Sequence, residues 1–176
     1  MQKIIIGLVF AVAIISLATP PLGIVVTSYA QKTTNLDKNS TKGSLTSIQN
    51  DASTLKPAWI VSGVFRMDNA STTSPVFNAT FHMMKTNGTA SHQHTISDFK
   101  LNGTPTTSNN STIFNGTSTV TMKEGPVKEV PTSITFIDES AVSIKLDPSK
   151  TNNHFGNTPI YGTQHLICVE YPNYCK

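Results

Sequence analysis

A single two-residue turn constrains the fold of this chain more than any other feature. Asn87-Gly88 separates two segments in which apolar and polar residues alternate. Asn-Gly is the pair most typical of a type I′ β-hairpin, because both turn positions need a positive φ. We therefore predict a hairpin with one strand over residues 76–86 and the other over residues 92–101.

The turn also predicts which residues of the two strands lie opposite each other. Counting outward from Asn87-Gly88 pairs Met83 with His92, and cross-strand partners share a face. One face then holds Ala79, Phe81, Met83, His92, His94 and Ile96, and the other holds Asn78, Thr80, His82, Gln93, Thr95 and Ser97. The second face is wholly polar, so we expect it to meet solvent and the first to meet the core. Beyond Ile96 the alternation slips, which predicts a β-bulge near Ser97-Asp98 that returns Phe99 to the core.

The rest of the chain shows the same kind of short segment. Further strands are predicted over residues 59–67, 111–122, 127–137, 141–146 and 164–170. Short strands separated by Gly, Pro, Asn and Ser are typical of one antiparallel β-sandwich or barrel. We place this all-β domain at residues 58–176. Residues 31–57 are polar without a sustained period, and we expect them to be a disordered linker.

The N-terminus carries an export pattern. Lys3 precedes an apolar run from Ile4 to Ala18, and Ser28-Tyr29-Ala30 offers small residues for a signal peptidase. This pattern predicts a signal peptide over residues 1–30, cleaved after Ala30. The alternative is an uncleaved membrane anchor helix over residues 4–26, although Pro20-Pro21 interrupts it. Both interpretations place the domain outside the cytoplasm, secreted or at the cell surface.

Composition agrees with an exported protein. Only 13% of the 176 residues are charged, and the net charge is +3 without a basic cluster, which excludes a nucleic-acid partner. The chain holds Asn-x-Ser/Thr glycosylation sequons at Asn39, Asn69, Asn78, Asn87, Asn102, Asn109, Asn110 and Asn115. Its two cysteines, Cys168 and Cys175, are expected to form a disulfide, with free thiols or a metal pair as the alternative.

The inward-facing histidines are the candidate functional residues. Residues i and i+2 of a strand project side by side, so His92 and His94 can both reach one metal ion, and imidazole is the commonest metal ligand in proteins. We propose His154 as the third ligand, with His165, Asp98 and Met83 as weaker candidates. A histidine site without thiolate suits copper or zinc, and Met83 would favour copper. In the alternative without metal, the histidines hydrogen-bond to loop carbonyls or to Asp98.

Several motifs resemble a family of small secreted proteins from ammonia-oxidising archaea (Thaumarchaeota), which is uncharacterised. They are Trp59 with Gly63, Gly88-Thr89 leading into His92-Gln93-His94 and Phe99, His154-Phe155-Gly156, and Pro159-Ile160-Tyr161-Gly162. The resemblance covers residues 59–162 and implies that His92, His94 and His154 belong to one pattern. The copper-rich surroundings of such organisms favour copper by association.

Two copper-protein classes fit less well. The His-x-His tripeptide is similar to that of Cu/Zn superoxide dismutases, but their bridging histidine and aspartate-rich zinc loop are missing from this sequence. A blue-copper carrier needs a cysteine ligand in its metal-binding loop. The two cysteines of this chain, Cys168 and Cys175, are better explained as each other's disulfide partners.

Three functional hypotheses result. The first is an exported copper- or zinc-binding module, and the second is a glycosylated cell-surface structural or adhesion domain with no metal. The third and least favoured is an enzyme using the same metal, because the sequence has no nucleophile elbow, phosphate loop or paired-carboxylate motif.

Overall fold

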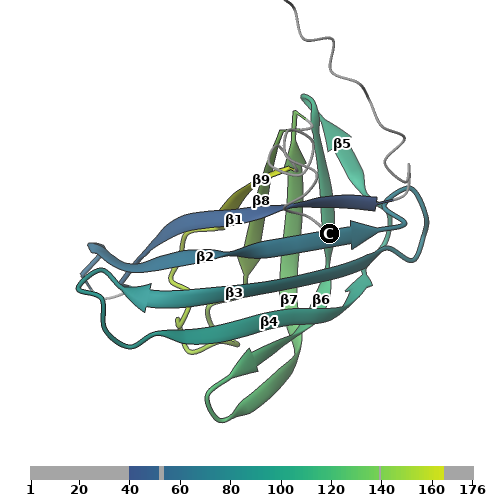
Figure 1. Ribbon diagram of the computed structural model, residues 1–176. Helices are drawn as coiled ribbons and strands as arrows, with labels where there is room; N and C mark the ends of the chain where they lie inside the picture. The colour runs from purple at the N-terminus through teal and green to yellow at the C-terminus, as the bar shows by residue number, and fades with distance from the viewer. Residues whose placement is uncertain (1–39, 52–53, 139, 165–176) are drawn as a thin grey trace, which may run out of the picture. The chain divides into compact units, whose positions relative to one another are not determined.

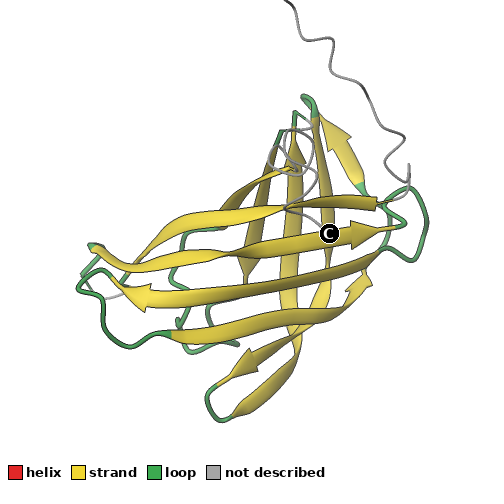
Figure 2. Ribbon diagram, viewed as in Figure 1, coloured by secondary structure: helices red, strands yellow, loops and turns green. Residues whose placement is uncertain are grey.

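The computed structural model describes residues 40–51, 54–138 and 140–164 (Figure 1). Figure 2 shows the described chain as strands joined by loops and turns, without a helix. The strands are β1 (Ser40–Asn50), β2 (Pro57–Asp68), β3 (Val76–Lys85), β4 (His92–Leu101), β5 (Thr106–Ser108), β6 (Ser111–Met122), β7 (Gly125–Ile137), β8 (Ala141–Leu146) and β9 (Ile160–Gln164). The prediction of an all-β domain is confirmed.

The strands close into a barrel. Their order is β4-β3-β2-β1-β9-β8-β7-β6-β5, and a further pairing of β4 with β6 joins the two sides. Eight strands therefore form a closed antiparallel ring, and β5 is an extra strand paired to β6. In Figure 1, β1–β4 form one layer and cross β6–β9 behind them at a steep angle. Of the two predicted architectures, the structure has the barrel.

Side chains fill the barrel interior, as expected for a ring of this size. Each strand contributes alternate residues, because successive side chains point to opposite faces. Among the largest fully buried side chains are Phe77, Phe81, Leu45, Met67, Met83, Ile96, Ile134, Ile144 and Ile160. This core packs against both β3 and β4, which lie beside each other.

The register of the β3–β4 hairpin is the predicted one. Ala79 lies opposite Ile96, Phe81 opposite His94, and Met83 opposite His92. The predicted inner residues Phe81 and His94 are buried, whereas His82 and Gln93 on the other face are exposed. The predicted bulge is also present, because the β4–β6 register shifts between Ser97 and Lys100, and Phe99 is buried.

The turn itself differs from the prediction. The Gly88 N–H donates to the Lys85 carbonyl, and the Lys85 N–H donates to the Thr89 carbonyl. Gly88 has a φ of 82° and Asn87 is not in the left-handed region, so the loop has three residues with glycine at its last position rather than a type I′ turn. Ala90, with a φ of 55°, then adds one residue on the β4 side. The third loop residue shifts the strand pairing by one position, and the extra residue at Ala90 shifts it back. The register beyond Ala90 is therefore the predicted one.

The predicted linker is wrong over residues 40–50. This segment is β1, which pairs with β2 along its length and with β9 over Gly43–Leu45. Its inward residues include Ser47 and Gln49, both buried, while the apolar Ile48 points outward and is 60% exposed. Over residues 47–49 the alternation is therefore inverted in polarity, and with Leu45 as the one fully buried apolar residue the hydrophobic pattern of a half-buried strand does not show.

Several predicted features lie outside the described residues. They are the leader over residues 1–30, the sequon at Asn39, the cysteines Cys168 and Cys175, His165, and the end of the last predicted strand. β9 ends at Gln164, the first residue of that prediction. Within the described ranges there is no helix long and apolar enough to cross a membrane.

Candidate metal centre

Two ligand candidates lie at the start of β4. His92 is partly buried, and His94 is 3% exposed. Their inward direction depends on Ala90, because the Lys85–Thr89 pair alone would place Ser91 opposite Met83 and turn both histidines outward. The extra residue restores the inward face. Both rings therefore project from one strand into the same end of the barrel.

The third candidate, His154, lies in the loop between β8 and β9. Asn152 and Asn153 have φ values of 50° and 55°, a conformation that asparagine tolerates better than most residues. The chain then turns inward, because Phe155 is buried against Phe81, with ring centroids 5.8 Å apart. This anchor brings His154 from a distant part of the chain over the β4 histidines.

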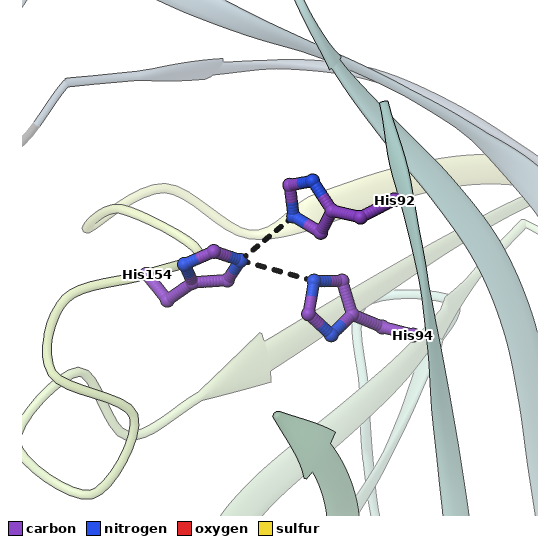
Figure 3. A group of neighbouring side chains, drawn as sticks. All are labelled: His92, His94 and His154. Carbon is purple, nitrogen blue, oxygen red and sulfur yellow. Dashed lines mark hydrogen bonds between the residues drawn. The ribbon is translucent and has the colours of Figure 1, made fainter. Parts of the chain in front are cut away.

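The three imidazoles point toward one another (Figure 3). The Nε2 atom of His154 is 3.0 Å from Nε2 of His92 and 3.0 Å from Nε2 of His94. One ligand atom from each ring lies within 4.8 Å of the others. Zinc–nitrogen bonds of about 2.0–2.1 Å place tetrahedral nitrogens about 3.4 Å apart, so an ion would widen the two 3.0 Å separations by a few tenths of an ångström and bring the third pair, within 4.8 Å, to a similar distance.

The Nδ1 atoms of His92 and His94 each form a hydrogen bond with a backbone carbonyl oxygen. Nδ1 of His92 is 2.7 Å from the Ala90 carbonyl oxygen, and Nδ1 of His94 is 2.6 Å from the Thr121 carbonyl oxygen. A carbonyl oxygen only accepts hydrogen bonds, so both Nδ1 atoms carry a hydrogen. In a neutral ring Nε2 then has a bare lone pair. Backbone carbonyls hold metal-ligating histidines in this tautomer.

The hydrogen count leaves one of the three Nε2 atoms without a hydrogen-bond partner in the cluster. Neutral His92 and His94 supply no hydrogen at Nε2, so only His154 can donate. One N–H can satisfy one of the two acceptors at a time, and an unsatisfied buried polar atom costs about 1–3 kcal/mol. An ion at the centre would accept all three lone pairs. The arrangement therefore suits a cation better than a hydrogen-bond network.

The environment favours the neutral form that a metal requires. Burial lowers the pKa of His94, and the charge of His92 lowers it further, against the opposing effect of the Thr121 carbonyl. Burial, and then the neighbouring His94 and His92, lower the pKa of His154 to about 4. Protons therefore compete weakly for these two nitrogens at neutral pH.

Aromatic side chains wall the site. Trp59, the only tryptophan, lies with its ring centroid 5.3 Å from that of His92 and 6.1 Å from that of His154. Phe155 contacts His94 and His154 at 4.9 and 5.0 Å. The Lys85 ammonium lies 5.7 Å from the Trp59 ring centroid. These ring contacts hold the orientations of the three imidazoles.

The structure also shows where the other residues considered in the sequence analysis lie. His82 faces outward and is exposed, as expected. Asp98 is not in the cluster: it is exposed at the bulge with a φ of 52°, and its carboxylate accepts a hydrogen bond from Ser97. Met83 is fully buried opposite His92. All seven described sequon asparagines are exposed: Asn69, Asn78, Asn87, Asn102, Asn109, Asn110 and Asn115.

Comparison with known proteins adds no homologue. No family model, curated protein or solved structure matches this chain. The geometry alone therefore defines the site: a β-barrel in which His92, His94 and His154 form a cluster that could hold a metal ion.

Proposed function

We propose that this protein is an exported metal-binding β-barrel that holds one copper or zinc ion through Nε2 of His92, His94 and His154. The observation that carries the proposal is the convergence of three Nε2 atoms, two of them left without hydrogen by Nδ1–carbonyl bonds. Three neutral imidazoles without thiolate are the ligand set that copper and zinc accept. Three protein ligands also leave one tetrahedral position for a water or an incoming ligand.

The proposed role is metal capture or delivery at the cell surface. The leader pattern over residues 1–30 supports export, and it leaves open whether the chain is released or anchored. The exposed asparagines of the described sequons are accessible to glycosylation. The N-terminal sequence and intact mass of protein isolated from its own cells test export, glycan occupancy and the Cys168–Cys175 disulfide.

Metal titration of the full chain tests the central proposal. Calorimetry with Zn²⁺, and quenching of Trp59 fluorescence with Cu²⁺, are expected to show one ion per chain. A lost outer-sphere partner alone typically costs about 10–100-fold in metal affinity, so His94→Ala and His154→Ala are expected to cost at least that much. His82→Ala is the matched control, because it removes an exposed histidine from the neighbouring strand.

Equal affinity in wild type, His94→Ala and His154→Ala would refute the metal site. The structural alternative, a glycosylated surface domain with no metal, would then be favoured. An equal loss in His82→Ala would indicate adventitious surface binding.

A further inference from the structure

A buried glutamine lies beside the loop that carries His154. Gln49, at the end of β1, has no exposed surface, and its side chain points into the barrel. A buried amide is costly unless its polar groups are paired, and an apolar residue would fill the same space without that requirement. Its presence therefore calls for a reason beyond packing.

All the polar groups of the Gln49 amide have partners. Nε2 donates to the Ser47 hydroxyl at 3.0 Å and to the Pro159 carbonyl at 3.0 Å. Oε1 accepts a hydrogen bond from the Thr158 hydroxyl at 2.7 Å. Two of these three bonds join β1 to the segment just after His154, so Gln49 fixes the end of the ligand-bearing loop.

Gly156 brings the same loop against β1. A Cβ atom at Gly156 would lie 2.8 Å from the Asn50 carbonyl oxygen and 3.7 Å from Oε1 of Gln49. Gly156 also has a φ of 69°, which glycine adopts without strain. The loop backbone therefore contacts the end of β1 two residues after His154.

The other two histidines have different supports. His92 is held by the Ala90 carbonyl and His94 by the Thr121 carbonyl, in the β3–β4 loop and in β6. None of these contacts involves β1. Gln49 also lies opposite Trp59, whose ring contacts both His92 and His154, so it is the hydrogen bonds of Gln49 to the loop that direct its main effect to His154.

We infer that Gln49 is a positioning residue for the metal centre: it sets His154 at the distance from His92 and His94 at which one ion can bind all three. This inference rests on the proposed function. Gln49 does not itself coordinate the ion. It acts through Thr158 and Pro159, and so its effect must vanish when the His154 ring is absent.

A double-mutant cycle on the full chain tests this. Gln49→Met keeps the side-chain length and removes the amide, and its zinc affinity is expected to fall about 10–100-fold, the range found for lost outer-sphere partners. In a His154→Ala background the same substitution should change zinc affinity less than about twofold. Gln164→Met is the matched control, since Gln164 is also buried but bonds to the Ala141 carbonyl.

The outcomes are distinguishable. Wild-type affinity in Gln49→Met, or an equal loss in both backgrounds, would overturn the positioning role while leaving the metal site intact. Failure of the wild type to bind either zinc or copper would overturn the proposed function itself. Should Gln49→Met not fold, Thr158→Val removes the bond to Oε1 from an exposed residue, and the same cycle applies with a smaller expected loss.

Discussion

His94 and Thr121 are joined by a hydrogen bond of 2.6 Å from Nδ1 to the backbone carbonyl oxygen across the β4–β6 seam of the barrel. Barrel closure thus determines the tautomer of a buried ring. We predict that long-range ¹H–¹⁵N spectra of the metal-free protein at pH 7.5 show His92 and His94 protonated at Nδ1. Added zinc should shift their Nε2 resonances and leave the tautomer unchanged. A dominant Nε2–H form of His94 would contradict the proposed ligand atoms.

Zinc should stabilise the fold by mass action. The ligands lie on β4 and on the β8–β9 loop, so unfolding separates them and abolishes the site. Free zinc at 100 times its dissociation constant adds about 2.7 kcal/mol. For a domain of this size we expect Tm to rise by roughly 10 °C. Thermal melts with zinc and then with excess chelator measure this, with His154→Ala expected to show at most half of the rise and His82→Ala the full rise.

The metal-free protein should lose stability in mild acid. The pKa of His154 falls from 6.5 to about 4 on folding, so between these values the unfolded chain binds a proton that the folded chain does not. Stability rises with pH where the unfolded state binds more protons, so the free energy of unfolding should decrease as pH falls from about 6.5 to about 4. The lowered pKa of His94 acts in the same direction.

Urea unfolding at several pH values between 7.5 and 4 checks this prediction. His154→Leu should show a shallower decrease than wild type, because it removes the ring with the shifted pKa. His82→Ala should follow the wild-type curve. A decrease that is identical in all three proteins would assign the acid sensitivity to other groups.

The hairpin shows what the sequence could predict. Alternation of Phe81, Met83, His92 and His94 defined the inner face, and burial of that face constrains the register strongly. The turn type did not follow, because Asn87-Gly88 also suits a three-residue loop with Gly88 in the left-handed region. The extra residue at Ala90 has no sequence signal, since alanine rarely adopts a φ of 55°.

Gln49 shows what the sequence could not predict. The end of its strand carries polar Ser47 and Gln49 inward and Ile48 outward, which reverses over these residues the pattern that marks a strand. Gln49 is accommodated inside the barrel because the Thr158 hydroxyl and the Pro159 carbonyl of the β8–β9 loop pair with its amide. Such a contact depends on a pairing between β1 and β9 that is remote in sequence. The sequence could single out His154 because histidine is a common metal ligand. Nothing in the sequence marks Gln49 as the residue that pairs with the His154 loop.

The close approach of Gly156 to β1 allows the effect of backbone strain to be measured separately from the effect of the contact with Asn50. Gly156→Ala forces a side chain into the left-handed region and places Cβ 2.8 Å from the Asn50 carbonyl oxygen. We expect a loss of about 2 kcal/mol in the free energy of unfolding, together with weaker zinc binding because His154 moves with the loop.

Gly88→Ala is the matched control, since its φ is 82° but nothing lies within 4 Å of the added Cβ. It should cost about 1 kcal/mol from backbone strain alone and retain wild-type zinc affinity. Urea unfolding and zinc titration of both variants measure the two effects, and unchanged zinc affinity in Gly156→Ala would show that the loop holds His154 without its contact to β1.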